Sequence, residues 1–214
     1  MDCLIRLVQA DATLGNLSAN LEAHLAHIDK AIADRIDLVV FPELSLTGYF
    51  LKDQTAEVAL AADAELFAPI RERSKTISIA LGFVERARDG RVFNAVGLFE
   101  DGELVHVHRK VHLVTYGMFE EARDLAAGEA FQIVESKHGR FGFLTCEDAW
   151  HVDGGYLYFL GGADAIIVCS AGPGRGVGTG GEGLASNRVW ATLQDAMSIL
   201  YLYARDEGFS PPAD

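Results

Sequence analysis

Three residues of complementary chemistry each follow directly on an apolar segment: Glu43, Lys110 and Cys146. Cys146 ends the segment FGFLT, which is typical of a β-strand. A thiol held where a strand gives way to a turn is exposed at the sheet edge, and the N–H of the next residue can face the atom that the thiol attacks. The alternative is an ordinary core cysteine, because free cysteine is among the most frequently buried residues.

Glu43 follows the apolar segment DLVVF and lies between Pro42 and Leu44, so its carboxylate is expected to be poorly solvated. Desolvation raises the pKa of a carboxylate toward the range that suits a general base. The alternative is a solvated loop carboxylate. Lys110 also follows a predicted strand, where a fixed ammonium could stabilise an oxyanion. Most lysines only solvate a surface, and neither residue is decisive alone.

A second chemistry, metal binding, is suggested by His106, His108 and His112 in HVHRKVH. Two histidines in an HxH pair on a strand point to the same face, as metal ligands would. No third ligand follows at a suitable spacing, so we interpret the pair as a solvated strand face and predict no metal. A metal-dependent hydrolase remains an alternative, which elemental analysis of the purified protein would test.

A glycine-rich segment, GPGRGVGTGGEG, covers residues 172–183. Gly176, Gly178 and Gly181 satisfy GxGxxG, the pattern of a phosphate-binding loop, but no Lys-Ser/Thr pair accompanies them and no acidic residue follows at about 20 positions. A surface loop is the better interpretation. A role in gating access to a substrate is a hypothesis that loop shortening would test.

The elements that must position these residues alternate between strands and helices in the first part of the chain. The pattern predicts a strand over 3–9, a helix opening at Asn16 or Ser18, and a buried strand over 37–41. An alanine-rich helix is predicted over 56–74. Strands over 77–84, 92–99 and 103–109, joined by short turns with Gly90 and Gly102, then predict an antiparallel meander.

The second part of the chain has the same mixed character. We predict short strands over 131–134 and 141–145, a helix over 152–160, a buried strand over 164–170, a helix over 187–196 and a last strand over 199–204. Strands with helices outside them indicate layered α/β packing. No repeat or linker divides the chain, so we predict one domain over 1–204 and a polar tail over 205–214.

Composition excludes several classes of partner. The formal net charge is −13, without a local cluster of Lys and Arg, which disfavours nucleic acid and anionic membrane surfaces. No apolar run reaches the roughly 20 residues that span a bilayer, and no signal peptide is evident. Cys3, Cys146 and Cys169 are widely spaced and odd in number, which argues against a disulfide framework. We therefore predict a cytoplasmic protein.

The local sequences around Glu43, Lys110 and Cys146 favour a catalytic role over the structural alternatives. FPELSLTGY (41–49), RKVHLVTYGMFEEARDLAAG (109–128) and FGFLTCEDAW (141–150) resemble, in this order, the three catalytic motifs of the nitrilase superfamily of carbon–nitrogen hydrolases. The resemblance runs from the first strand to about Ala204. HLVTYGMFEEAR and CEDAW are most similar to the glutaminase-type amidohydrolase domain attached to some NAD synthetases.

The resemblance implies a role for each matching position. The family's general base falls on Glu43, its lysine on Lys110 and its nucleophile on Cys146. The accessory glutamate matches Glu121, with Glu120 as the alternative. The oxyanion would also receive the backbone N–H of Glu147. The candidates for lining the substrate pocket are Tyr49, Tyr116 and Trp150.

The resemblance also implies a fold, a reaction and a partner. The fold is a four-layer α-β-β-α sandwich, here expected to lack the last strands of the second sheet because relatives continue beyond the position of Ala204. The reaction is hydrolysis of a small amide, without a cofactor. The partner is a second copy of the chain, in a dimer or higher homo-oligomer. The alternative function is a shortened, catalytically silent module that acts by dimerisation or binding.

Overall fold

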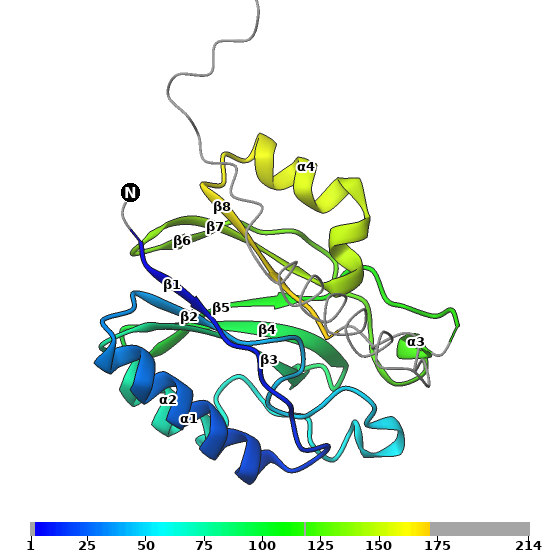
Figure 1. Cartoon of the computed structure of the whole chain (residues 1–214). Helices are drawn as coiled ribbons and strands as arrows, with labels where there is room; N and C mark the ends of the chain where they lie inside the picture. The colour runs from blue at the N-terminus through cyan, green and yellow to red at the C-terminus, as the bar shows by residue number, and fades with distance from the viewer. Residues whose placement is uncertain (1–2, 118, 172–214) are drawn as a thin grey trace, which may run out of the picture.

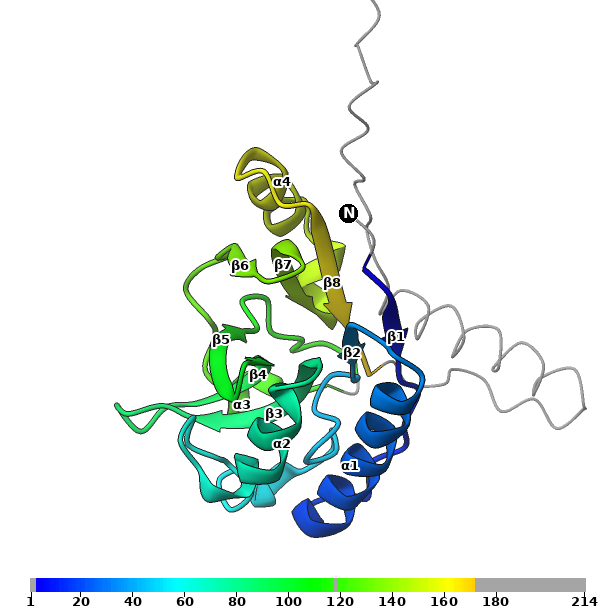
Figure 2. The same ribbon diagram turned by 90° about the vertical axis from the view of Figure 1, so that its left-hand side faces the viewer.

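Two β-sheets lie face to face, and helices cover the outer side of each (Figure 1). The computed structural model describes residues 3–117 and 119–171, and these contain all four layers of the predicted α-β-β-α sandwich. Figure 2 shows the same layers from the side, with α4 on the far side of the molecule from α1 and α2. The predicted fold class is therefore confirmed.

The larger sheet has five strands in the order β1-β2-β3-β4-β5. β1, β2 and β3 are parallel, whereas β3, β4 and β5 form the predicted antiparallel meander. The helices α1 and α2 pack on the outer face of this sheet (Figure 1). The bounds are β1 Ile5–Leu7, α1 Leu17–Ala33, β2 Leu38–Val40, α2 Ala68–Ser74, β3 Ser78–Arg86, β4 Val92–Glu100 and β5 Glu103–Arg109.

The smaller sheet has the strand order β6-β7-β8 among the described residues, and α4 packs on its outer face. The bounds are β6 Val134–Ser136, β7 Gly139–Thr145, α4 Val152–Leu160 and β8 Ala165–Cys169. The prediction of a strand over 131–134 is wrong in position, because the strand lies two to three residues later, at Val134–Ser136. β6 pairs with β7 from Val134 to Ser136, because the tight turn before Gly139, at φ 135°, fixes which residues can pair.

Alternation along β2 explains how one strand serves two cores. Leu38 and Val40 point between the two sheets, whereas Val39 and Phe41 point toward α1 and α2. Successive side chains of a strand point to opposite faces, so a strand buried on both faces is apolar throughout. This is why β2 carries no polar residue until the chain leaves the core.

The predicted helix over 56–74 is mostly wrong. Only Ala68–Ser74 is α-helical, preceded by single 3₁₀ turns at Lys52–Gln54 and Glu65–Phe67. Pro69 lies in the first turn of α2. A proline is accepted there, but inside a helix it lacks the N–H and its ring collides with the preceding turn. The alanine-rich stretch before it instead runs along the sheet, where Leu60 forms a bridge to Glu85.

The glycine-rich segment 172–183, the helix 187–196, the strand 199–204 and the tail 205–214 lie outside the described residues. The same holds for the predicted domain boundary at 204 and for the last strands of the second sheet. Along the described stretches, the structure contains no helix whose length and apolar character would let it cross a membrane.

Candidate active site

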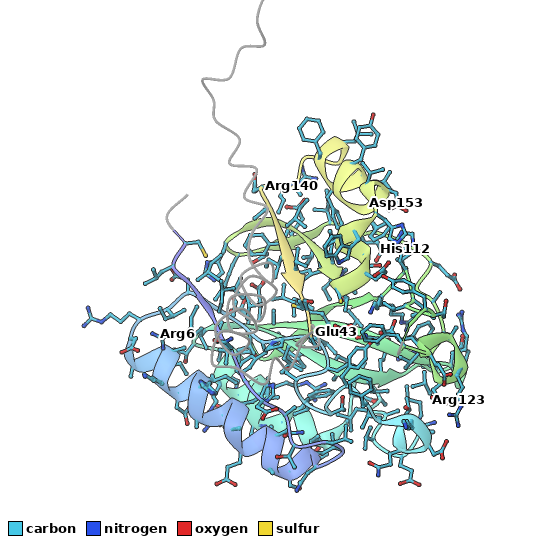
Figure 3. All side chains as sticks on the ribbon, turned by 45° about the vertical axis from the view of Figure 1, so that its right-hand side comes forward. Arg6, Glu43, His112, Arg123, Arg140 and Asp153 are labelled. Carbon is cyan, nitrogen blue, oxygen red and sulfur yellow. The ribbon has the colours of Figure 1, made fainter. Side chains whose placement is uncertain are left out.

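The predicted site residues gather where strands of both sheets end. Glu43 follows β2, Lys110 follows β5 and Cys146 follows β7. β2 and β5 both run in the direction of β3, so their carboxyl ends lie at the same edge of the larger sheet. Figure 3 shows Glu43 beside the end of β8, and the N–H of Ala171, just past β8, donates to Glu43 Oε2 at 2.9 Å.

Glu43 is fixed from three sides in a buried position, with 2 % of its surface exposed. Its Oε1 accepts hydrogen bonds from Lys110 Nζ at 2.9 Å and from Asn94 Nδ2 at 2.7 Å. Gly82 of β3 makes room for the turn that carries Glu43, since a Cβ there would lie 2.3 Å from Leu44 N and 2.4 Å from Pro42 O. The local fold therefore depends on a glycine of the neighbouring strand.

Lys110 has no exposed surface and lies between two carboxylates. Its Nζ donates to Glu43 Oε1 at 2.9 Å and to Glu121 Oε1 at 2.8 Å. Its backbone continues the sheet, because its N–H donates to Asn94 O at 2.9 Å and its carbonyl accepts from Gly128 N at 2.7 Å. One ammonium thus bridges two buried carboxylates from distant parts of the chain.

Glu121, and not Glu120, is the glutamate that faces the lysine. Glu121 opens the short helix α3 Glu121–Asp124 and is buried, whereas Glu120 is exposed. Glu121 Oε1 also accepts a hydrogen bond from the Tyr49 hydroxyl at 2.5 Å, and Oε2 accepts from Val114 N at 2.9 Å. The geometry therefore separates two neighbours that the sequence left as alternatives.

Cys146 begins a 3₁₀ helix over Cys146–Trp150 and has a left-handed backbone, with φ 46°. A non-glycine residue rarely adopts this conformation, which costs about 1–2 kcal/mol. The thiol is partly exposed and hydrogen-bonds with the Ser170 side chain. The N–H groups in the first turn of a helix have no partner within it, and Glu147 lies in that turn. The thiol and this N–H therefore both lie at the turn where β7 passes into the 3₁₀ helix.

The charges of these groups affect one another. Burial, followed by the charge of Glu43, raises the pKa of the Cys146 thiol to about 12, while Lys110 and Ser170 oppose the shift. Burial also raises the pKa of Glu43, against the opposing charge of Lys110. Burial alone would lower the pKa of Lys110, but the charges of Glu43 and Glu121 outweigh it and raise that pKa. The resting cluster therefore holds a neutral thiol and a charged ammonium.

Sequence reasoning missed two residues of this cluster and one that supports it. Asn94 donates to Glu43, Ser170 contacts Cys146, and Asp148 binds the backbone on both sides of the site. Asn94 left a signal, because it is the one polar side chain in the apolar strand VFNAVGLF. The roles of Ser170 and Asp148 depend on contacts that no local pattern predicts.

A cavity of about 420 Å³ opens beside Glu43, and Tyr49 and Ser170 line it. Of the three predicted pocket residues, only Tyr49 is among its described lining. Tyr116 and Trp150 have 57 % and 65 % of their surfaces exposed, and the Tyr116 hydroxyl donates to Glu147 Oε2 at 3.0 Å. The structure therefore brings Tyr49 to this cavity and leaves Tyr116 and Trp150 outside it.

The interpretation of the HxH pair as a solvated strand face is wrong. His108 is buried and hydrogen-bonds to Asp148 at 2.9 Å, and His106 stacks on Phe143 of the other sheet. β5 packs against the second sheet, so this face of the strand is a layer interface. His112 pairs with Asp153, in the first turn of α4 (Figure 3). Within residues 3–117 and 119–171, no three His, Cys, Asp or Glu side chains are arranged to hold a metal ion.

The sequence is similar to part of several glutamine-dependent NAD(+) synthetases. It is 27 % identical over 169 residues to a glutamine-dependent NAD(+) synthetase of Acinetobacter baylyi, covering 79 % of this chain and 31 % of that protein. It is 31 % identical over 151 residues to the Thermotoga maritima protein of the same name, covering 69 % of this chain and 26 % of that protein. The chain thus spans about a third or less of these relatives.

Solved structures show the same fold. The glutamine-dependent NAD+ synthetase of Acinetobacter baumannii matches with a TM-score of 0.71 and 27 % identity, over 88 % of this chain and 35 % of that one. Nit3 of Saccharomyces cerevisiae, a member of the nitrilase superfamily, matches with a TM-score of 0.69 and 27 % identity, over 78 % of this chain and 64 % of that one. The carbon–nitrogen hydrolase family model matches residues 4–199. The chain therefore belongs to the carbon–nitrogen hydrolase family, within the nitrilase superfamily.

Proposed function

We propose that the protein hydrolyses the carbon–nitrogen bond of a small amide, with Cys146 as nucleophile, Glu43 as general base and Lys110 as oxyanion stabiliser. The observation that carries this proposal is the buried Glu43–Lys110–Glu121 cluster, whose charges act on the partly exposed Cys146 thiol. A buried ammonium between two carboxylates costs desolvation energy, and such perturbed groups concentrate at functional sites.

The first half of the reaction forms a thioester. Glu43 accepts the thiol proton, and the sulfur of Cys146 attacks the amide carbonyl carbon. The oxyanion of the tetrahedral intermediate is stabilised by the Lys110 ammonium and the N–H of Glu147. Protonated Glu43 then delivers its proton to the leaving nitrogen, the carbon–nitrogen bond breaks, and ammonia or an amine departs.

The second half releases the acid. Glu43 accepts a proton from water, the hydroxyl adds to the thioester carbonyl, and the carbon–sulfur bond breaks as the thiol regains its proton. These steps require no metal or organic cofactor. A thiol with a pKa of about 12 is almost entirely protonated at neutral pH, so a neighbouring proton acceptor is needed. The raised pKa of Glu43 makes its carboxylate a better proton acceptor for this task.

Glu121 would orient the Lys110 ammonium. The Tyr49 hydroxyl donates to the same carboxylate oxygen as Lys110, at 2.5 Å. Burial and the charges of Glu43 and Glu121 raise the pKa of Tyr49, which keeps its hydroxyl protonated as a donor. The ammonium is thereby held in one place before the substrate arrives, and preorganised charge is more effective in stabilising an oxyanion than mobile charge.

The proposed substrate is a small amide. The cavity beside Glu43, of about 420 Å³, falls in the size range of small-molecule sites. The relatives are named for their dependence on glutamine, so glutamine and other ω-amides of dicarboxylic acids are the first compounds to test. The three cysteines are free thiols, and a reactive thiol is maintained in a reducing compartment, which supports a cytoplasmic location.

Mass spectrometry of the intact protein tests this proposal. Incubation with a panel of amides is expected to add one acyl group to Cys146 and to release ammonia or an amine. Cys146→Ala should abolish both without unfolding the protein. Cys3→Ala is the matched control, since Cys3 is also a partly exposed free thiol but lies outside the site. Full activity in Cys146→Ala would refute the assignment.

The second candidate function is a silent module that acts by self-association, and one observation favours it. Among the residues that the structure describes, α4 carries several apolar side chains that are at least half exposed: Val152, Tyr156, Leu157 and Leu160. Exposed apolar patches of this kind mark interaction sites. A second copy of the chain is the proposed partner, through α4. Self-association of the protein, with no acyl adduct on Cys146 from any amide tested, would favour this function over the first.

A further inference from the structure

Asp148 accepts four hydrogen bonds and has no exposed surface. Its Oδ1 accepts from the backbone N–H groups of Val111 at 3.0 Å and His112 at 2.8 Å. Its Oδ2 accepts from Thr145 N at 3.0 Å and from His108 Nε2 at 2.9 Å. Each oxygen therefore has two donors, which is the number of lone pairs that a carboxylate oxygen offers.

The donors belong to the two chain segments that carry the proposed ammonium and the proposed nucleophile. Val111 follows Lys110 directly, and Thr145 precedes Cys146 directly. One carboxylate thereby fixes the backbone next to both residues. β5 and β7 belong to different sheets, so no strand pairing sets the distance between these two segments.

The bond to Thr145 N also bears on the left-handed backbone of Cys146. It closes a short ring from Thr145 to Asp148, with Cys146 inside it. A left-handed non-glycine residue persists only when the surrounding structure holds it in place. The four bonds to Asp148 supply such a restraint at this corner.

We propose that Asp148 is a positioning residue for the reaction, which acts through the backbone of Thr145 and Val111 to set Cys146 against Lys110. It contacts neither substrate nor reacting atoms. His108 completes its hydrogen bonding from β5. This inference rests on the proposed function, because it assigns the placement of that same thiol and ammonium.

Asp148→Asn is the first test. The amide has the shape of the carboxylate, but its NH₂ group cannot accept, so two of the four bonds are lost. A displacement on the scale of 1 Å at a reacting group costs about 100-fold in rate. We expect kcat to fall about 100-fold with KM changed by less than about threefold. Asp164→Asn, at a partly exposed carboxylate that accepts the backbone N–H of Arg140 outside the site, is the matched control and should leave kcat unchanged.

Alkylation of Cys146 by iodoacetamide, followed by peptide mass, gives a readout that needs no amide substrate. Burial, the charge of Glu43 and the charge of Lys110 together set the pKa of this thiol, so a thiol displaced from the cluster should titrate differently. We expect the pH profile of alkylation in Asp148→Asn to differ from that of the wild type. If Asp148→Asn does not fold, His108→Leu and His108→Gln replace it: leucine removes the donor to Asp148 and should lower kcat, and glutamine keeps a donor and should restore it.

The two hypotheses fail in distinguishable ways. Full activity in Cys146→Ala would refute the proposed function whatever Asp148 does. The positioning role is overturned if folded Asp148→Asn keeps kcat within about twofold and its alkylation profile superimposes on that of the wild type. It is equally overturned if Asp164→Asn loses as much kcat as Asp148→Asn, or if His108→Leu matches the wild type where Asp148→Asn does not fold.

Discussion

At the scale of single residues, the site is an arrangement of buried charges that depend on one another. One ammonium lies between two carboxyl groups, and the neighbouring thiol remains neutral because an uncompensated charge would be costly there. Removing one member therefore changes the protonation of the others.

Lys110→Met is expected to destabilise the protein by about 3–5 kcal/mol at neutral pH, the cost of breaking a buried ion pair from one side. Without the ammonium, burial and the loss of the opposing charge raise the folded pKa of Glu43 further above the unfolded value, near 4.3. A carboxylate with a raised folded pKa loses stability as pH rises. The deficit against the wild type should therefore shrink toward about pH 4.

Urea unfolding of Lys110→Met and the wild type at both pH values measures this difference. Adding Glu43→Gln to Lys110→Met removes one of the two unpaired carboxylates and should restore part of the stability at neutral pH. A deficit that does not change between neutral and acid pH would contradict the charge argument and leave a packing defect as the cause.

Glu43→Gln is expected to separate thiol acidity from catalysis. The charge of Glu43 raises the pKa of Cys146, so its removal should bring that pKa below about 12 and increase alkylation of Cys146 by iodoacetamide at alkaline pH. Amide hydrolysis should fall at least about 100-fold, because the general base is lost. Glu120→Gln changes an exposed neighbour of the site and should alter neither rate. Slower alkylation in Glu43→Gln would contradict this account.

At the scale of elements, the turn after β2 depends on how closely it approaches β3. Gly82→Ala would place a Cβ 2.3 Å from Leu44 N, and backbone cannot yield as a flexible side chain can. We expect Gly82→Ala to destabilise the protein by about 1–3 kcal/mol through overpacking and to lower hydrolysis, because the turn carries Glu43. Thermal unfolding and kcat measure the two effects.

Gly155→Ala is the matched control for this prediction. Gly155 lies inside α4, and a Cβ there meets no atom within 4 Å. Alanine in a helix interior is more favourable than glycine by about 0.5–1 kcal/mol, so this variant should be slightly more stable and fully active. If Gly82→Ala behaves like Gly155→Ala, the close approach of the turn to β3 does not position Glu43.

At the scale of the whole molecule, both faces of the larger sheet are covered, whereas the described residues leave apolar side chains on the outer side of α4 exposed. Tyr158 faces inward and donates to Phe143 O at 2.7 Å, while Leu160 has 61 % of its surface exposed. A surface helix usually carries polar side chains on its outer side, but α4 carries apolar ones there. A partner on this side would bury that apolar area.

Leu160→Asp is expected to weaken self-association, raising its Kd at least about tenfold, because it sets a charge into an apolar contact. Sedimentation equilibrium over a range of protein concentrations measures this change. Val105→Asp alters a comparably exposed apolar residue on β5 and should leave association unchanged. An equal effect of both variants, or no effect of Leu160→Asp, would remove α4 as the proposed interface.

The sequence by itself determined the strand that precedes each chemistry-bearing residue. Apolar runs and turn glycines are local signals, so the meander from β3 to β5 and the positions of Glu43 and Cys146 at strand ends followed from neighbours along the chain. The family motifs then indicated the layered fold. For the alanine-rich stretch before Pro69 the sequence predicted a helix that does not form. Its composition favours a helix, but its contact with the sheet holds it in another conformation.

Only the tertiary structure decided which side chains meet. Glu121 and Glu120 are neighbours of equal chemistry, and packing against Lys110 alone distinguishes them. The contacts of Asn94 with Glu43, and of Asp148 with the backbone beside Lys110, join segments far apart in the chain. Such contacts depend on the register between strands and on the distance between the two sheets. These are properties of the packed molecule, and no local pattern along the chain encodes them.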